Sequence, residues 1–230
     1  MIKRMKSGIP GLDRILKGGI PVGSLILISG GVGAGKTIMG LQFIYNGATK
    51  YNENGLFLSL EEDKAKLIEE GKVFGWDFEK LEGEKKAFIV KAELYRFDAL
   101  KNLILDYISS FHVKRVVIDT ITTLSLLFER PVELKKSISE LASLFRSKEC
   151  VGLITSEIPE GSSKISLFGV EEFAADGVIV LHSLRSGNYV SRAVEVKKLR
   201  LTRVSSKLYP AKITKIGYVV YSHEEFLKSM

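Results

Sequence analysis

The chain has 230 residues, of which 45% are hydrophobic and 27% charged, as expected for one globular α/β domain over residues 1–230. A single cysteine, Cys150, excludes an intrachain disulfide and a cysteine-cluster metal site, and no stretch is apolar for long enough to cross a bilayer. The net charge of +7 permits nucleic-acid binding, but the lysines and arginines are spread along the chain among glutamates, so we interpret them mainly as solvated helix faces. The basic start lacks the apolar stretch of a secretion signal, which favours a cytoplasmic protein.

Short apolar runs alternate with longer segments of helical periodicity along most of the chain. The runs predict strands at residues 24–28, 55–60, 87–90, 115–119, 151–155 and 177–181. Helices are expected at residues 38–51, 64–73, 97–111 and about 133–147. The last part alternates as β segments at 209–214 and 218–222, with a turn at Ile216-Gly217. The order predicts an α/β fold with a mostly parallel central sheet flanked by helices, extended by antiparallel β-hairpins at the C-terminal end.

The segment between the first predicted strand and the first predicted helix is rich in glycine. Residues 30–37 match the phosphate-binding pattern G-x-x-x-x-G-K-[ST] of a P-loop. Glycine backbone can direct several N–H groups around a phosphate at the positive end of the following helix. We therefore expect ATP to be bound by Gly30, Gly31, Val32, Gly33, Ala34, Gly35, Lys36, Thr37 and Ile38. Lys36 would reach the β and γ phosphates, and Thr37 would place its hydroxyl on a Mg²⁺ ion.

Carboxylates end two of the other predicted strands. Asp119 closes the fourth strand, where it can hold a water of the magnesium ion beside Thr37. Glu61 and Glu62 end the second strand, at the edge where open α/β sheets bind ligands. Because side chains alternate along a strand, we favour Glu61 as the base that activates the attacking water, with Glu62 supporting it. The alternative is that both acids begin a helix, where negative charge suits the helix dipole.

Further segments accompany these motifs in a particular order. They are GIPGLD at 8–13, GGIPVGS at 18–24, FGWD at 74–77, TSE at 155–157, GVEEFAADGVI at 169–179 and KKLR at 197–200. Together with the P-loop, the paired glutamates and Asp119, they resemble the RecA superfamily and most closely its KaiC-like branch. The resemblance implies a RecA-like P-loop NTPase that assembles head to tail into a homo-oligomer, usually a hexameric ring, with ATP at each subunit interface.

The resemblance also implies roles for particular residues. Glu61 and Glu62 match the family's catalytic glutamates, and the basic segment reaches the ATP of the neighbouring subunit. The residues implied in that trans contact are Lys198, Leu199, Arg200 and Thr202. On a β segment, alternation puts Lys198 and Arg200 on the same face. The sequence departs from the clock members of the family after Arg200, and the loop at 160–166 lacks their Ser-Thr pair, so autokinase activity is not inferred.

Three functions remain open at this point. The first is an Mg²⁺-dependent, ring-forming ATPase with a regulatory or signalling role and an unidentified protein partner, which the paired glutamates favour. The second is a nucleotide-gated scaffold with negligible turnover. The third is a DNA-associated ATPase like the RadA recombinases, whose DNA contacts come from loops after the fourth and fifth strands. Here those places, Glu129-Arg130-Pro131 and residues 159–168, carry little positive charge, so nucleic acid is possible but not favoured.

Overall fold

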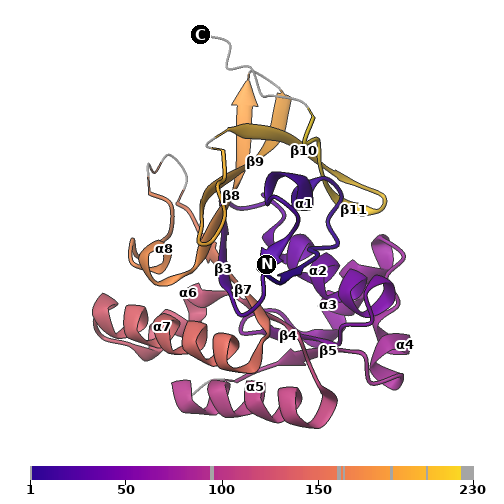
Figure 1. Cartoon of the computed structure of the whole chain (residues 1–230), viewed down its shortest axis with the longest axis vertical. Helices are drawn as coiled ribbons and strands as arrows, with labels where there is room; N and C mark the ends of the chain where they lie inside the picture. Colours follow the sequence, from indigo (N-terminus) through magenta and orange to yellow (C-terminus); the bar gives the residue numbers. More distant parts are fainter. Residues whose placement is uncertain are drawn as a thin grey trace.

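The computed structural model describes residues 2–93, 96–159, 162, 164–186, 189–205 and 207–223 (Figure 1). Within these residues, one sheet of nine strands has the order β11-β10-β9-β8-β3-β7-β6-β4-β5, and a two-stranded sheet pairs β1 with β2. The strands are β1 (Arg4–Met5), β2 (Ile20–Pro21), β3 (Leu25–Gly30), β4 (Gly55–Ser59), β5 (Ala87–Lys91), β6 (Arg115–Asp119), β7 (Val151–Glu157), β8 (Gly177–Ser186), β9 (Tyr189–Leu199), β10 (Leu208–Thr214) and β11 (Gly217–Val220). The helices are α1 (Leu12–Ile15), α2 (Lys36–Lys50), α3 (Lys64–Val73), α4 (Phe78–Gly83), α5 (Phe97–Phe111), α6 (Ile121–Leu124), η1 (Ser125–Leu127), α7 (Pro131–Lys148) and α8 (Glu171–Ala174).

The large sheet has a parallel part and an antiparallel part. Neighbouring strands from β8 across β3 to β5 are parallel, and β3 lies between β7 and β8. From β8 onward, β9, β10 and β11 are added antiparallel. Every residue of β3, β4 and β6 is buried, which explains why these strands are continuous apolar runs in the sequence. The predicted fold class is confirmed.

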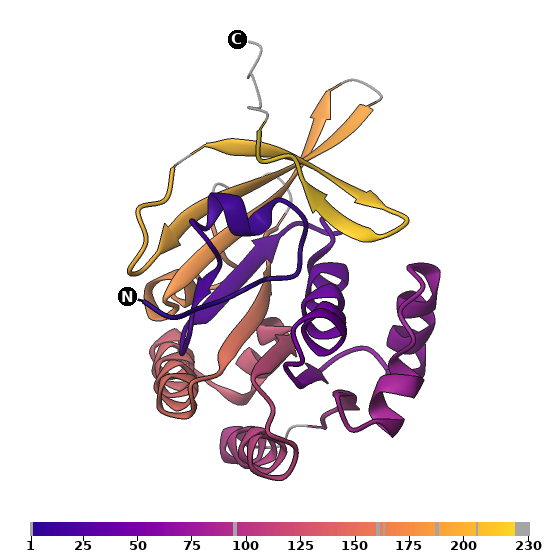
Figure 2. The same cartoon turned by 45° about the vertical axis from the view of Figure 1, so that its right-hand side comes forward.

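Helices cover both faces of the parallel strands (Figures 1 and 2). Because side chains alternate along a strand, Ile26 and Ile28 of β3 pack with α2, α3 and the N-terminal segment. Leu25 and Leu27 of the same strand pack with α5 and α7 on the other face. None of the helices in the described segments is both long and apolar enough to cross a membrane.

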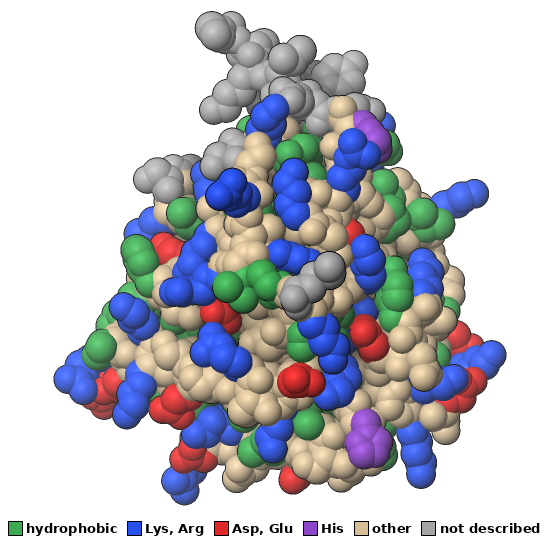
Figure 3. All heavy atoms as spheres, in the orientation of Figure 1, with side chains coloured by type: hydrophobic (Ala, Val, Ile, Leu, Met, Phe, Trp, Pro, Cys, Tyr) green, Lys and Arg blue, Asp and Glu red, His purple; other side chains and the backbone are tan. Residues whose placement is uncertain are grey.

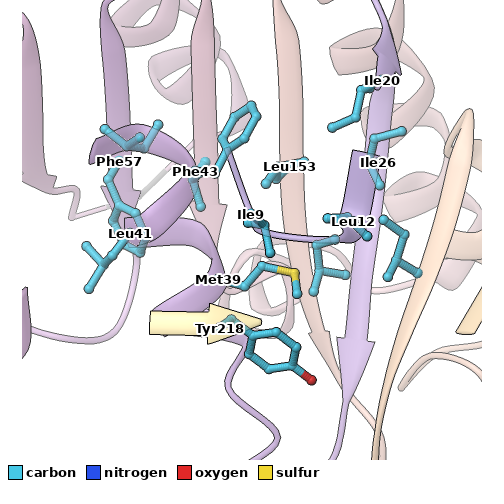
Figure 4. Packing of buried hydrophobic residues seen from close by; sticks show 14 of the residues in the cluster. Ile9, Leu12, Ile20, Ile26, Met39, Leu41, Phe43, Phe57, Leu153 and Tyr218 are labelled. Carbon is cyan, nitrogen blue, oxygen red and sulfur yellow. The ribbon is translucent and has the colours of Figure 1, made fainter. Parts of the chain in front are cut away.

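The N-terminal segment is held against α2 by packing and by a buried arginine. Figure 4 shows Ile9 in the same cluster as Met39 of α2 and Tyr218 of β11. Arg115, the first residue of β6, is fully buried and donates hydrogen bonds to the carbonyl oxygens of Lys6 (2.7 Å) and Phe43 (3.0 Å). The segment that precedes the P-loop strand is thereby fixed to the core.

The carboxyl ends of the parallel strands bring the predicted phosphate-site residues to one edge of the sheet. In the register of the strands, Gly30 at the end of β3 pairs with Glu157 at the end of β7. Ser59 at the end of β4 pairs with Asp119 at the end of β6. The residues expected to form the nucleotide site therefore lie together at the carboxyl ends of β3, β4, β6 and β7.

Helix α4 and strand β9 are among the elements that were not predicted from the sequence. Helix α4 (Phe78–Gly83) is short, and its N-cap Asp77 accepts a hydrogen bond from the Lys80 N–H (2.9 Å). Strand β9 is long and pairs with β8 along most of its length, although its sequence mixes apolar and charged residues. Both elements depend on tertiary contacts that a local pattern does not carry.

Candidate nucleotide site

The glycine-rich loop connects β3 directly to the first turn of α2. Gly33 and Gly35 have φ angles of 72° and 97°, in the left-handed region that glycine adopts without strain. Gly35 lies against the antiparallel extension, since a Cβ added there would lie 3.0 Å from the ring of Tyr218 and from the Cδ1 methyl of Ile213. Because α2 begins at Lys36, the unpaired N–H groups of its first turn lie next to the loop. This is the geometry of an anion site at a helix N-terminus.

Lys36 bonds to the loop and lies among carboxylates. Its ammonium donates to the carbonyl oxygens of Gly30 (2.9 Å) and Gly31 (3.1 Å). Burial lowers the pKa of Lys36, and the charges of Glu157, Asp119 and Glu61 oppose that shift, with Glu157 the largest. Glu157 belongs to the TSE segment at 155–157, and no role was predicted for it from the sequence. Its register with Gly30 on the neighbouring strand is what places it at the loop.

Asp119 is buried and accepts hydrogen bonds from two threonine hydroxyls. Its Oδ2 lies 2.9 Å from Thr37 Oγ1, and its Oδ1 accepts from Thr155 Oγ1. Burial raises the pKa of Asp119, while the hydrogen bonds from Thr155 and Thr37 lower it. A carboxylate beside a hydroxyl is the oxygen donor set that Mg²⁺ prefers, with water completing its octahedron. The residues therefore fit a magnesium site held by Thr37 and Asp119.

The paired glutamates lie beyond the end of their strand, which corrects the alternation argument. Strand β4 ends at Ser59, and residues 60–62 form a bend, so side-chain alternation does not distinguish Glu61 from Glu62. Ser59 Oγ donates to the Glu62 carbonyl oxygen (2.6 Å). The Glu62 carboxylate pairs with Lys66 Nζ (2.5 Å), whereas Glu61 is exposed and its carbonyl oxygen accepts from Lys91.

Both glutamates remain close to the phosphate loop. The charge of Glu61 acts on Lys36, and the charge of Glu62 acts on Asp119. Glu62 is engaged by a lysine, so Glu61 is the member of the pair with a carboxylate available to a water molecule. Helix α3 begins at Lys64 with Asp63 as its N-cap, so neither glutamate belongs to the first turn of the helix.

The basic segment implied in trans contacts lies away from the loop. Strand β9 ends at Leu199, and Arg200 lies in a turn, so the prediction of a β segment through Arg200 is wrong. Lys198 and Arg200 nevertheless face one region, because Lys198 Nζ donates to the Ala175 carbonyl oxygen (2.7 Å) and Arg200 Nε lies 3.7 Å from Asp176 Oδ1. Arg200 is exposed, Leu199 is buried and Thr202 is half-buried.

Another arginine of β9 contacts the phosphate loop of its own chain. Arg192 Nη2 donates to the Gly33 carbonyl oxygen (3.3 Å). Within the described part of the chain, its Nε is buried without a hydrogen-bond partner, as is the hydroxyl of Tyr218. The sequence analysis missed Arg192, because nothing in the local pattern of β9 shows which end of the strand reaches the loop.

A buried carboxylate organises the segment between β7 and α8. Glu171 is fully buried and accepts hydrogen bonds from Ser156 Oγ (3.1 Å), Ser166 Oγ (2.7 Å) and the Val170 N–H (3.0 Å). Ser156 adjoins Glu157 at the end of β7, so this network is anchored beside the phosphate loop. Residues 160, 161 and 163, which belong to the loop considered for DNA contacts and autophosphorylation, lie outside the described residues.

The fold and the loop geometry define the chain as a P-loop nucleotide-binding protein with a RecA-like fold. A family model described as "ATPase: KaiC" matches residues 5–225. The chain therefore belongs to the KaiC ATPase family, which confirms the resemblance seen in the sequence.

Relatives and a solved structure extend this result. The chain is 35% identical over 237 residues to the UPF0273 protein MJ1359 of Methanocaldococcus jannaschii, covering 96% of this chain and 97% of that protein. It is 33% identical over 230 residues to the circadian clock oscillator protein KaiC of Nostoc sp., but spans only 44% of the length of that protein. The crystal structure of the KaiC-like protein PH0186 from Pyrococcus horikoshii OT3 has a TM-score of 0.88 and 39% identity, covering 96% of this chain and all of that one.

Proposed function

We propose that this chain is an Mg²⁺-dependent ATPase that assembles head to tail into a hexameric ring, with each ATP held between two subunits, and that it has a regulatory role. The observation that carries the proposal is the convergence of the P-loop, Asp119 and the paired glutamates at one edge of the sheet. Clock activity is not transferred to it, because the chain spans 44% of the length of the clock protein.

In the proposed reaction, some residues bind the phosphates and others act on the attacking water. The N–H groups of the loop and of the first turn of α2 bind the phosphates, and Lys36 supplies a positive charge to them. Thr37 and Asp119 would hold the Mg²⁺ ion, which would neutralise negative charge on the bound phosphates. Glu61 orients the attacking water and accepts its proton, while the hydrogen bond from Ser59 Oγ to the Glu62 carbonyl oxygen holds the adjacent backbone.

The proposed ring follows from where the basic segment lies. Arg192 contacts the loop of its own chain, and Lys198 follows six residues later along the same strand. At about 3.3 Å per residue, an extended strand places Lys198 about 20 Å along β9 from Arg192. The end of β9 pairs with Gly177, which pairs with Ile26 near the start of β3, whereas the loop follows the end of β3. Arg200, which is exposed, is therefore out of reach of its own nucleotide and available to that of a second copy. An arginine supplied in trans would stabilise charge on the transferred phosphoryl group.

The proposal is tested by separating ATP binding from turnover. Glu61→Gln should slow hydrolysis by about 10²- to 10⁴-fold, the usual contribution of a general base, while ATP still raises the melting temperature. Glu69→Gln, an exposed change on α3, is the matched control and should hydrolyse ATP like the wild type. If Glu61→Gln hydrolysed ATP as fast as the wild type, Glu61 would not be the base that activates the water. Binding without turnover in the wild-type protein would instead support the nucleotide-gated scaffold.

A further inference from the structure

Several cations on or beside the helices are paired with neighbouring acids. Ion pairs join Lys64 to Glu82 (2.6 Å), Lys72 to Glu79 (2.7 Å), Lys101 to Glu140 (2.9 Å) and Arg130 to Glu133 (2.6 Å). For these residues the interpretation as solvated helix faces holds. Residues 18–176 together contain 19 lysines and arginines and 23 acids, so the excess positive charge of the molecule lies outside them.

Two stretches far apart in the sequence carry that excess. Residues 2–17 contain five lysines and arginines and one acid. Residues 177–223 contain nine lysines and arginines and one acid. The acid of the first stretch is Asp13, and that of the second is Glu195, which pairs with Lys197 (2.6 Å) and lies 3.0 Å from His182. Asp176, directly before the second stretch, lies 3.7 Å from Arg200. The local positive charge is therefore little compensated.

Hydrogen bonds bring these two stretches together on one surface. Arg4 donates through Nη1 to the Gly19 carbonyl oxygen (2.9 Å) and through Nη2 to the Leu201 carbonyl oxygen (3.0 Å), which joins the N-terminal segment to the loop after β9. Arg14 on α1 lies 2.9 Å from His223, just beyond β11. Figure 3 shows blue side chains gathered over the upper half of this face, with little red among them.

We call this surface the basic patch, and it consists of Lys3, Arg4, Arg14 and Lys17. All of these residues except the half-buried Arg4 are exposed. Among the residues that the structure describes, no ion pair involves Arg14 or Lys17. Lys3 has only a long contact with Glu149 (3.8 Å), and both side chains are exposed, so it contributes little.

We propose that the basic patch binds the phosphate backbone of duplex DNA without reading its sequence. A cluster of exposed, uncompensated cations gains free energy on such a backbone by releasing its condensed counterions. No aromatic residue occurs in residues 2–23 or 200–207. Single-stranded nucleic acid is bound largely by stacking of bases on aromatic side chains, so this composition favours the duplex. The patch is separate from the loops after β6 and β7, and the proposal does not depend on ATP hydrolysis.

The test compares two triple variants with the same reduction in charge. Lys3→Gln, Arg14→Gln and Lys17→Gln together remove three cations of the patch and one exposed ion pair. The matched control combines Lys50→Gln, Lys72→Gln and Lys80→Gln on α2, α3 and α4, and it also removes one exposed ion pair, between Lys72 and Glu79. Binding of a fluorescent duplex of random sequence is measured by anisotropy over a series of salt concentrations, and folding is checked by thermal unfolding.

We expect the patch variant to bind the duplex at least tenfold more weakly than the wild type at low salt. The slope of log affinity against log salt should fall by about 0.9 for each phosphate that is no longer neutralised, and the control variant should keep the wild-type slope. Equal binding by the patch variant and the control would overturn the proposal. So would tighter binding of a single strand than of the duplex, binding of anionic vesicles in place of DNA, or a change in particle mass with no change in duplex affinity.

Discussion

Replacing Asp119 by Asn should make the protein more stable and less able to bind magnesium nucleotide. Asp119 is 7% exposed, and burial raises its pKa, so the charged carboxylate is unfavourable in the folded chain near neutral pH. Asn keeps the shape, and the hydroxyls of Thr37 and Thr155 can donate to it or accept from it. We expect a gain on the order of 1 kcal/mol, which raises the melting temperature by ~2–4 °C in a chain of this length.

The pH dependence of this gain has a definite sign. An acid whose pKa is raised by folding destabilises the folded state above that pKa, and the cost disappears as the pH falls through it. The difference in melting temperature between Asp119→Asn and the wild type should therefore shrink as the pH is lowered through the raised pKa of Asp119. With Mg²⁺ and ATP at one hundred times the dissociation constant, the wild type should gain about 2.7 kcal/mol, and the variant should lose most of that gain.

Thermal unfolding with and without Mg²⁺-ATP measures both effects in one experiment. Asp77→Asn is the control, because Asp77 is an exposed N-cap and Asn caps a helix about as well. A variant at Asp119 that melts below the wild type at pH 8, yet keeps its full Mg²⁺-dependent shift, would refute the reasoning.

Three further predictions concern the loop, the core and the assembly. Gly30→Ala should lower the free energy of unfolding by about 1–3 kcal/mol, because its Cβ would lie 2.7 Å from a backbone carbonyl oxygen. Gly31→Ala is the control and should be near neutral, since its Cβ would meet nothing closer than 3.9 Å. Equal costs for the two variants would contradict this prediction. Arg115→Ala should cost about 3–5 kcal/mol by leaving buried partners unpaired, and a melting temperature within 3 °C (about 1 kcal/mol) of the wild type would argue against it. Arg200→Ala should lose ATPase activity and regain part of it when mixed with Lys36→Ala, and no recovery in mixtures shown to co-assemble would exclude a trans arginine.

The buried parallel strands β3, β4 and β6 were predictable because they are apolar on both faces. Helix α5 begins and ends where the periodicity of residues 97–111 predicts, and the P-loop has the strand before it and the helix after it that its pattern requires. The proximity of Asp119 to Thr37 could also be anticipated, since the carboxyl ends of parallel strands meet at one edge.

The features that were missed depend on register and on long-range contacts. Glu157 reaches the loop only through the pairing of β7 with β3, and Arg192 reaches it only because β9 runs antiparallel to β8. The alternation argument for Glu61 was wrong because β4 ends at Ser59, and strand ends are set by tertiary pairing. The basic patch was not predicted because the sequence does not show that residues 3–17 lie beside Leu201 and His223.

Calorimetric titration of ATP into the wild-type protein and Lys36→Ala, each with and without Mg²⁺, tests the central claim most directly. The account predicts one ATP per chain for the wild type, weaker binding when Mg²⁺ is withheld, and a large decrease in affinity for Lys36→Ala. Equal affinity of the two proteins for ATP, unaffected by Mg²⁺, would contradict the assignment of the glycine-rich loop as the triphosphate site.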